Sequence, residues 1–98
     1  MSVEDDDPIR VLRAELAALD ERLVEAFNRR LELVLELRRV KEERGLDFLD
    51  PAREEWLRAH LAGTNRGPLS REGLHELVTE LLDLTKREVR RARTNDSS

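Results

Sequence analysis

The stretch NRRLELVLELRRVK, residues 28–41, decides the fold because its apolar residues repeat with the period of a long helix. The same stretch places two cations on the apolar face of that helix. An α-helix turns by about 100° per residue, so residues three, four and seven positions apart share a face. The apolar face formed in this way contains Leu16, Leu19, Leu23, Phe27, Val34 and Leu37. Arg30 and Lys41 fall on the same face, within about 40° of Leu16. Because cations rarely lie in the apolar seam of a helical core, these two residues need an explanation.

The helix that carries this stretch is predicted to be unusually long. Asp7 and Pro8 form a helix start, since aspartate caps the first turn and proline fits its first position. The apolar pattern continues to about Arg44, and Gly45 provides a stop. Such a helix has about 37 residues and a length of about 55 Å, whereas a compact chain of this size has a radius of gyration of about 13 Å. A second chain is the simplest cover for its apolar face, so we expect an intertwined homodimer.

Two further helices are predicted in the second half of the chain. The first begins at DPAREE, residues 50–55, with Asp50 as its cap, and ends at Gly63. The second is capped by Ser70, and its apolar face continues to Glu88. Because no stretch shows the alternation of a strand, the sequence predicts an all-α fold with one long, one short and one medium helix.

The composition agrees with one small helical domain. The chain has 98 residues, of which 41% are charged and 3% aromatic. This balance is typical of helices with solvated charged faces. We expect the helical domain to span residues 8–92, between a disordered acidic segment at 1–7 and a disordered tail at 93–98.

Several classes of function are excluded by the charge and by missing motifs. A net charge of −4 does not favour nucleic acid or an anionic membrane, and the basic run KREVRRAR at residues 86–93 lacks aromatic partners for bases. His60 and His75 are isolated and the chain has no cysteine, so we expect neither a metal site nor a cofactor. No apolar run reaches the roughly 18 residues of a membrane span, and the N-terminus lacks a signal core, so a cytoplasmic location is expected.

The two cations on the apolar face have two interpretations. A buried cation is costly unless it is paired, so neighbouring acids could neutralise both, or the long side chains could reach water. The acids within reach are Glu25, Glu32 and Glu36. The other interpretation is a binding site, because Arg13 lies one turn from the face, and Arg53 and Glu54 open the next helix. Several cations that converge on an apolar cavity bind a small dianion, and guanidinium groups suit carboxylates.

The spacing of these charges resembles the all-helical chorismate mutase family. LRAELAALDERLVEAFNRR at residues 12–30 is followed by VK at 40–41 and DPAREE at 50–55. The family has a leading Leu-Arg, a Leu-Asp further along the helix, a central arginine, a lysine eleven residues later, and an Asp-x-x-Arg-Glu motif at the second helix. All of these are present here without a gap. The resemblance covers about residues 8–90 and includes GPLS at 67–70.

This resemblance implies an intertwined dimer with two active sites, each formed mainly by one chain. Arg13 would reach each site from the other protomer. Arg13 and Arg30 would hold the two carboxylates of chorismate, and Lys41 would bind one carboxylate and the ether oxygen. The rearrangement of chorismate to prephenate needs no nucleophile, metal or cofactor, because the protein only clamps the reactive conformer and stabilises charge on the ether oxygen.

The remaining site residues follow from the same resemblance. Glu54, helped by Asp50 and Arg53, would bind the ring hydroxyl of the substrate. Thr85 matches a position at which the family usually has serine, near a carboxylate.

One position departs from the family pattern. The family usually has glutamine, sometimes glutamate, four residues after that serine, as a second donor to the ether oxygen, and here the position is Val89. The acid Glu88 precedes it. Either Glu88 supplies the contact and must be protonated to donate, or the contact is absent and the enzyme is weak or needs a partner enzyme. The first hypothesis predicts a rate that falls with rising pH. A third interpretation treats Glu88 as an ordinary solvated residue of the helix.

Three alternative functions share this fold. An isochorismate–pyruvate lyase uses nearly the same cationic pocket, although the trio Asp50, Arg53 and Glu54 favours a mutase. A mutase acting on amino-substituted chorismate is the second alternative. The third is a non-catalytic module that regulates a partner enzyme, which the altered end of the last helix favours. Cations kept in the apolar seam argue against the third alternative, because a scaffold does not need them.

Overall fold

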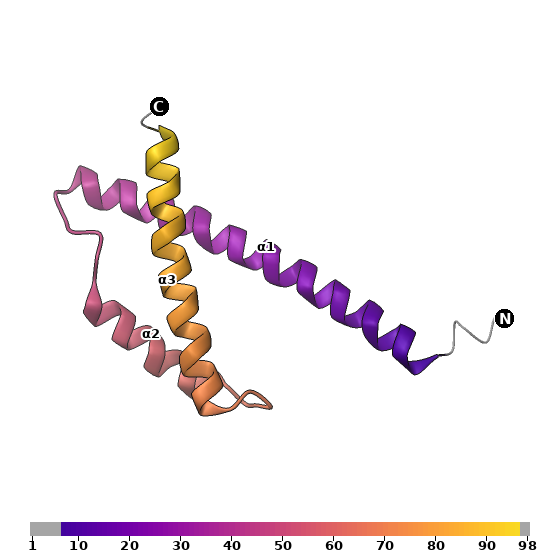
Figure 1. Ribbon diagram of the computed structural model, residues 1–98. Helices are drawn as coiled ribbons and strands as arrows, with labels where there is room; N and C mark the ends of the chain where they lie inside the picture. The colour runs from indigo at the N-terminus through magenta and orange to yellow at the C-terminus, as the bar shows by residue number, and fades with distance from the viewer. Residues whose placement is uncertain (1–6, 97–98) are drawn as a thin grey trace. The chain divides into compact units, whose positions relative to one another are not determined.

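The computed structural model describes residues 7–96 and contains three helices in the predicted order (Figure 1). Helix α1 spans Pro8–Glu43, α2 spans Pro51–Thr64 and α3 spans Arg71–Asp96. Their lengths are 36, 14 and 26 residues, and no strand occurs within residues 7–96. The prediction of an all-α chain with one long, one short and one medium helix is therefore confirmed.

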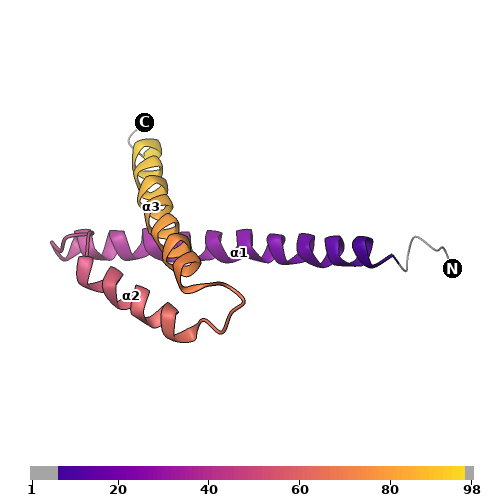
Figure 2. The ribbon, with the colours of Figure 1, turned by 60° about the horizontal axis from the view of Figure 1, so that its bottom comes forward.

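The ends of α1 follow from local chemistry. The Asp7 carboxylate accepts a hydrogen bond from the backbone N–H of Ile9 at 3.0 Å, which satisfies a donor of the first turn. At the other end Gly45 has a φ of 68°, a left-handed conformation that glycine adopts without steric cost. The N–H of Leu46 then donates to the carbonyl of Lys41 at 2.8 Å. Between these ends the α1 ribbon is uninterrupted (Figure 2).

The end of α2 differs from the prediction. Gly63 lies inside the helix, which ends at Thr64, and Asn65 is the cap. The backbone N–H of Asn65 donates to the Leu61 carbonyl at 3.0 Å. The side chain of Asn65 donates to the Leu69 carbonyl at 2.9 Å, so it ties the following loop to the helix end. An asparagine with these bonds ends the helix, whereas an isolated glycine within a helix is tolerated.

Helix α3 begins where the sequence predicts and continues further than expected. The Ser70 hydroxyl accepts a hydrogen bond from the Gly73 N–H at 2.9 Å, so Ser70 is the cap. The helix continues past residue 92 to Asp96, and the Thr94 hydroxyl donates to the Arg90 carbonyl at 3.1 Å. The acidic segment predicted at 1–7 lies outside the described residues except for Asp7, and so does the end of the predicted tail.

The chain divides into two compact units, residues 1–33 and 34–98, and α1 runs from the first into the second. The described part of the first unit is the N-terminal portion of α1. Most of its large apolar side chains are exposed, and Leu23 is 67% exposed. The exposed apolar row of this portion consists of Leu12, Leu16, Leu19 and Leu23. No residue of α1 is buried in the single chain.

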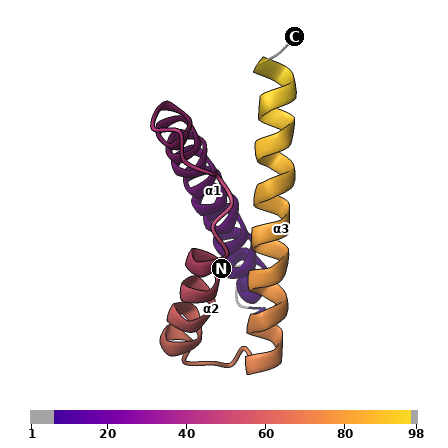
Figure 3. The ribbon, with the colours of Figure 1, turned by 90° about the vertical axis from the view of Figure 1, so that its left-hand side faces the viewer.

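The second unit contains the end of α1, α2 and α3. Helix α2 packs beside the N-terminal half of α3, and the C-terminal half of α3 extends beyond it (Figure 3). The buried residues of the described chain all lie on α3, and they are Val78, Leu82, Thr85 and Val89. The predicted apolar face of this helix included Val78 and Thr85, which are buried, but it also included Leu77, which is exposed. A helical wheel outlines a broad face, and packing against neighbouring elements selects which edge of that face is covered.

Among the described residues, no helix is long and apolar enough to cross a membrane.

Candidate functional site

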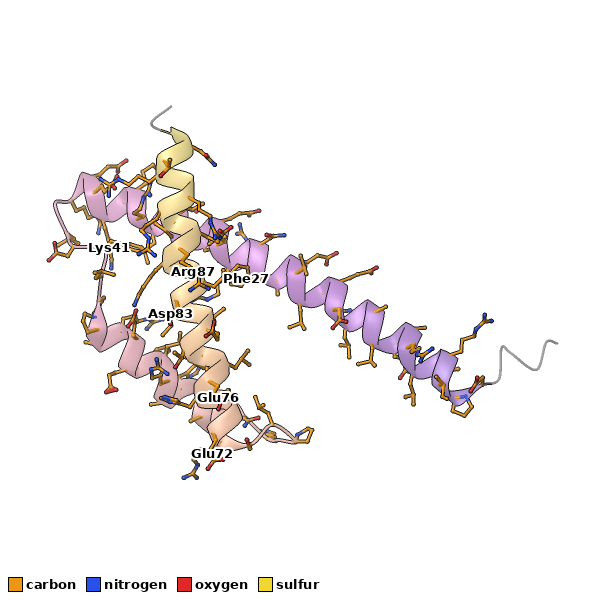
Figure 4. The ribbon with its side chains drawn as sticks, viewed as in Figure 1. Phe27, Lys41, Glu72, Glu76, Asp83 and Arg87 are labelled. Carbon is orange, nitrogen blue, oxygen red and sulfur yellow. The ribbon has the colours of Figure 1, made fainter. Side chains whose placement is uncertain are left out.

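Lys41 lies near the C-terminal end of α1, and Figure 4 shows it where the chain turns toward α2. Its side chain is half-buried. The Nζ of Lys41 donates to the Phe48 carbonyl at 3.2 Å, within the segment that connects the two helices. This bond uses one of the three N–H donors of the ammonium group. Lys41 is therefore held in place by its own connecting segment, with donor capacity for an anion.

The start of α2 brings three predicted site residues together. The Asp50 carboxylate accepts a hydrogen bond from the Arg53 backbone N–H at 3.1 Å, so this carboxylate caps the helix. The Arg53 guanidinium lies over the ring of Trp56, 3.9 Å from its centroid, and Trp56 stacks on His60 at 4.6 Å. Trp56 was not among the predicted site residues. The spacing of Arg53 and Trp56 could have indicated this contact, because residues i and i+3 are neighbours on a helix.

Glu54 pairs with Lys86, a cation that was predicted only as part of a basic run. The Glu54 Oε1 lies 2.8 Å from the Nζ of Lys86, across the contact between α2 and α3. The two side chains are 31% and 34% exposed. Lys86 directly follows the buried Thr85, so this ion pair joins the predicted acid of α2 to the residue after the predicted threonine of α3.

Glu88 and Val89 are adjacent in α3 but differ in burial and in contacts. Thr85 and Val89 are each 5% exposed, and they share one face of α3. The Thr85 hydroxyl donates to the Leu81 carbonyl at 2.6 Å. Glu88 is partly exposed, and its carboxylate accepts a hydrogen bond from Arg91 one turn further on. The valine therefore occupies the buried face, and the acid is engaged by a cation of its own helix.

A cavity of about 330 Å³ lies beside these residues in the second unit. Its lining combines cations with an apolar wall and consists of Arg38, Glu42, Phe48, Leu49, Lys86, Val89, Arg90 and Arg93. Arg38, which was not predicted as a site residue, is its most covered cation, with a side chain 15% exposed. The Arg38 Nη1 donates to the Val89 carbonyl at 3.3 Å and its Nε lies 3.7 Å from Glu42. The contact joins residues 51 positions apart, so no local pattern could have indicated it.

Arg13 and Arg30 belong to the first unit. Arg13 is exposed, whereas Arg30 is half-buried, and desolvation by burial lowers the pKa of the Arg30 guanidinium. A guanidinium remains protonated at neutral pH despite such a shift. Glu32, one of the acids expected to neutralise the cations, is paired with the neighbouring Arg29 at 3.0 Å.

The described residues contain no group of three or more histidine, aspartate or glutamate side chains placed to hold a metal ion. What the second unit does bring together is a half-buried lysine, an ion pair between Glu54 and Lys86, and a partly apolar cavity lined by further cations. Such an arrangement suits recognition of a small anion by charge-assisted hydrogen bonds.

Comparison with known proteins identifies the class of this helical chain. Residues 12–90 match the family model described as chorismate mutase type II. The chain belongs to this family.

Two curated relatives show the extent of the similarity in sequence. The chain is 32% identical over 83 residues to the bifunctional chorismate mutase/prephenate dehydratase of Pseudomonas aeruginosa, and 31% identical over 81 residues to the protein of that name in Stutzerimonas stutzeri. These matches cover 80% and 78% of this chain but only 23% and 22% of the relatives, so the chain spans less than a quarter of their length.

The structural matches extend over nearly whole molecules. Form I of the chorismate mutase from Thermus thermophilus has a TM-score of 0.78 at 32% identity, with 81% of this chain and 99% of that one covered. Form II has a TM-score of 0.81 at 30% identity, with 87% and 97% covered. The family assignment and the all-α fold inferred from the sequence are confirmed.

Proposed function

We propose that the protein is a chorismate mutase, which converts chorismate to prephenate by a [3,3] rearrangement. The observation that carries the proposal is the match of residues 12–90 to the chorismate mutase type II family. The cations of the site and the carboxylate of Glu54 agree with it, because the substrate is a dianion with a hydroxyl group. The reaction breaks a C–O bond while a C–C bond forms, so the protein must hold the reacting ends together and stabilise charge on the ether oxygen.

The roles of the residues are proposals as well. Arg30 and Arg13 would hold the two carboxylates, since guanidinium groups bind carboxylates with paired hydrogen bonds. Lys41 would bind one carboxylate and donate to the ether oxygen. Its bond to the Phe48 carbonyl supports this role, because a preorganised ammonium needs little rearrangement to meet the developing charge.

On α2, Glu54 would accept a hydrogen bond from the ring hydroxyl of the substrate. Asp50 would contribute mainly by capping the helix, and Arg53 by its charge near the same end of α2. Thr85 would lie near a carboxylate of the substrate, on the covered face of α3.

We also propose that the active form is a homodimer in which Arg13 reaches the partner's site. The support is the exposed leucine row of the first unit, together with the lack of any buried residue on α1. A continuous exposed apolar row is rare in a monomer, and a second copy of α1 would bring a matching row.

Position 89 leads us to expect a modest rate from the chain alone. The valine side chain has no hydrogen-bond donor, and the Glu88 carboxylate is engaged by Arg91. This arrangement favours the hypothesis that the second donor is absent and that the enzyme is slow or needs a partner enzyme. The cytoplasmic location expected from the sequence stays a prediction.

Product identification tests the proposed function. Purified protein is incubated with chorismate and, separately, with isochorismate. Prephenate from chorismate supports the mutase, salicylate with pyruvate from isochorismate identifies a lyase, and no product from either contradicts both activities for the chain acting without a partner enzyme.

Matched variants test the site. Lys41→Ala should lower kcat by about 100-fold or more, the usual loss when a donor to developing charge is removed. Arg30→Ala should lower kcat/KM by about 100-fold or more, because a substrate whose carboxylate is not held is misplaced for the reaction. Arg29→Ala removes the adjacent cation, whose ion pair with Glu32 is 66% exposed on both sides, and should leave the rate unchanged. Retained activity in Arg30→Ala or Lys41→Ala, with the protein folded, would show that the site is wrongly assigned.

A further inference from the structure

The ion pair between Glu54 and Lys86 is a contact that neither the spacing of the motif nor the roles above explain. Lys86 follows Thr85 in the sequence, and it lines the same cavity as Val89. Its ammonium is 2.8 Å from the Glu54 carboxylate, and about one third of each side chain is exposed. The pair links the first turn of α2 to the middle of α3.

The proposed function creates an electrostatic problem at Glu54. An acceptor for the ring hydroxyl must remain a carboxylate, but the substrate brings two negative charges close to it. Like charges within a few ångströms repel strongly where water is partly excluded. A cation in direct contact with Glu54 removes this repulsion without removing the hydrogen-bond acceptor, because a carboxylate has two oxygens and several lone pairs.

We propose that Lys86 is a positioning residue of the site, which neutralises and orients Glu54 so that a dicarboxylate can bind beside it. This proposal rests on the proposed function. The Glu54 Oε1 is the atom that meets Lys86, which leaves the other oxygen of this carboxylate for the substrate hydroxyl. The cavity that Lys86 also lines adds to the effect, because its cations Arg38, Arg90 and Arg93 outnumber its acid, Glu42.

A purely structural role makes a different prediction. An ion pair of this exposure contributes little to the stability of a protein. If Lys86 only joined α2 to α3, its replacement would lower thermal stability slightly and leave affinity for the substrate unchanged. If it neutralises Glu54, its replacement weakens binding of the dianion, and this loss depends on the charge of Glu54.

The test measures chorismate binding and turnover in Lys86→Met and in a matched control. Binding is followed by the fluorescence of Trp56, the only tryptophan of the chain, and turnover by prephenate formation. Lys86→Met should raise both Kd and KM by about tenfold, the size expected when one charged hydrogen bond is lost. Arg87→Met removes the same charge from the next residue of α3 (Figure 4), which is exposed, and should change Kd by less than about twofold.

Two further variants separate the mechanism from loss of folding. Lys86→Arg keeps the charge and should stay within about threefold of the unaltered protein. In a Glu54→Gln background, Lys86→Met should weaken binding much less, since no carboxylate remains to be neutralised.

The outcomes distinguish this proposal from the proposed function. If the unaltered protein converts chorismate but Lys86→Met behaves like Arg87→Met, the role of Lys86 is refuted and the function stands. An equal loss of affinity with and without the Glu54 charge also refutes it. If the unaltered protein neither binds nor converts chorismate, the proposed function fails, and the role of Lys86 falls with it.

Discussion

Replacing Arg38 with methionine tests how the end of α1 is attached to α3. The Arg38 guanidinium donates to the Val89 carbonyl at 3.3 Å and lies 3.7 Å from Glu42, with a side chain only 15% exposed. Methionine keeps much of the apolar stem but removes both polar contacts. The substitution therefore measures the guanidinium head rather than the packing.

The expected loss follows from the geometry of these contacts. A hydrogen bond to a charged group contributes about 1.5–3 kcal/mol in favourable geometry, but 3.3 Å is longer than ideal. The contact with Glu42, whose side chain is 54% exposed, adds little after allowance for solvent screening. We expect Arg38→Met to lower the free energy of unfolding by about 1–2 kcal/mol. For a domain of this size that corresponds to a fall in Tm of about 5–15 °C.

Urea denaturation followed by far-ultraviolet circular dichroism measures this loss. All variants are compared at one protein concentration, because the stability of a dimer depends on concentration. Arg29→Met is the control, since its ion pair with Glu32 is exposed and its removal should cost less than about 0.5 kcal/mol. A loss in Arg38→Met no greater than in the control would refute the inference that this arginine ties α1 to α3.

Three further predictions concern single residues. Val78→Ala should lower the free energy of unfolding by about 1–3 kcal/mol in urea denaturation, because this side chain is 2% exposed and its loss leaves a cavity; a cost near zero would show that the site collapses. Trp56→Leu should raise the KM for chorismate about two- to fivefold, since it removes the ring over which the Arg53 guanidinium lies. An unchanged KM would show that this contact plays no part in substrate binding. Glu88→Gln should leave the pH profile of kcat unchanged because Glu88 is engaged by Arg91, and a pH dependence that disappears in this variant would place Glu88 at the ether oxygen.

The helix boundaries were largely predictable, because capping is local chemistry. Asp7, Asp50 and Ser70 each bond to an N–H two or three residues further along the chain, so the relevant atoms are close in sequence. The end of α2 was missed because Asn65 bonds with the loop that follows, and Gly63 was the more conspicuous signal.

The covered edge of α3 was less predictable. Val89 and Glu88 are neighbours in the sequence, and both fall near the apolar face on a helical wheel. Contact with Arg38 and with the rest of the second unit covers Val89, while Glu88 bonds with Arg91. Periodicity defines a face to within about one residue, and packing decides between adjacent positions.

By itself, the sequence determined the number and order of the helices, their N-terminal caps and the family, because these depend on residues close together or on the spacing of a motif. Only the tertiary structure decided that Glu54 meets Lys86 and that Arg38 reaches Val89. Opposite charges are abundant in this chain, so composition allows many pairings. The packing of α3 against α2 and against the end of α1 selects among them, since an ion pair forms only where the folded backbone brings both groups within reach.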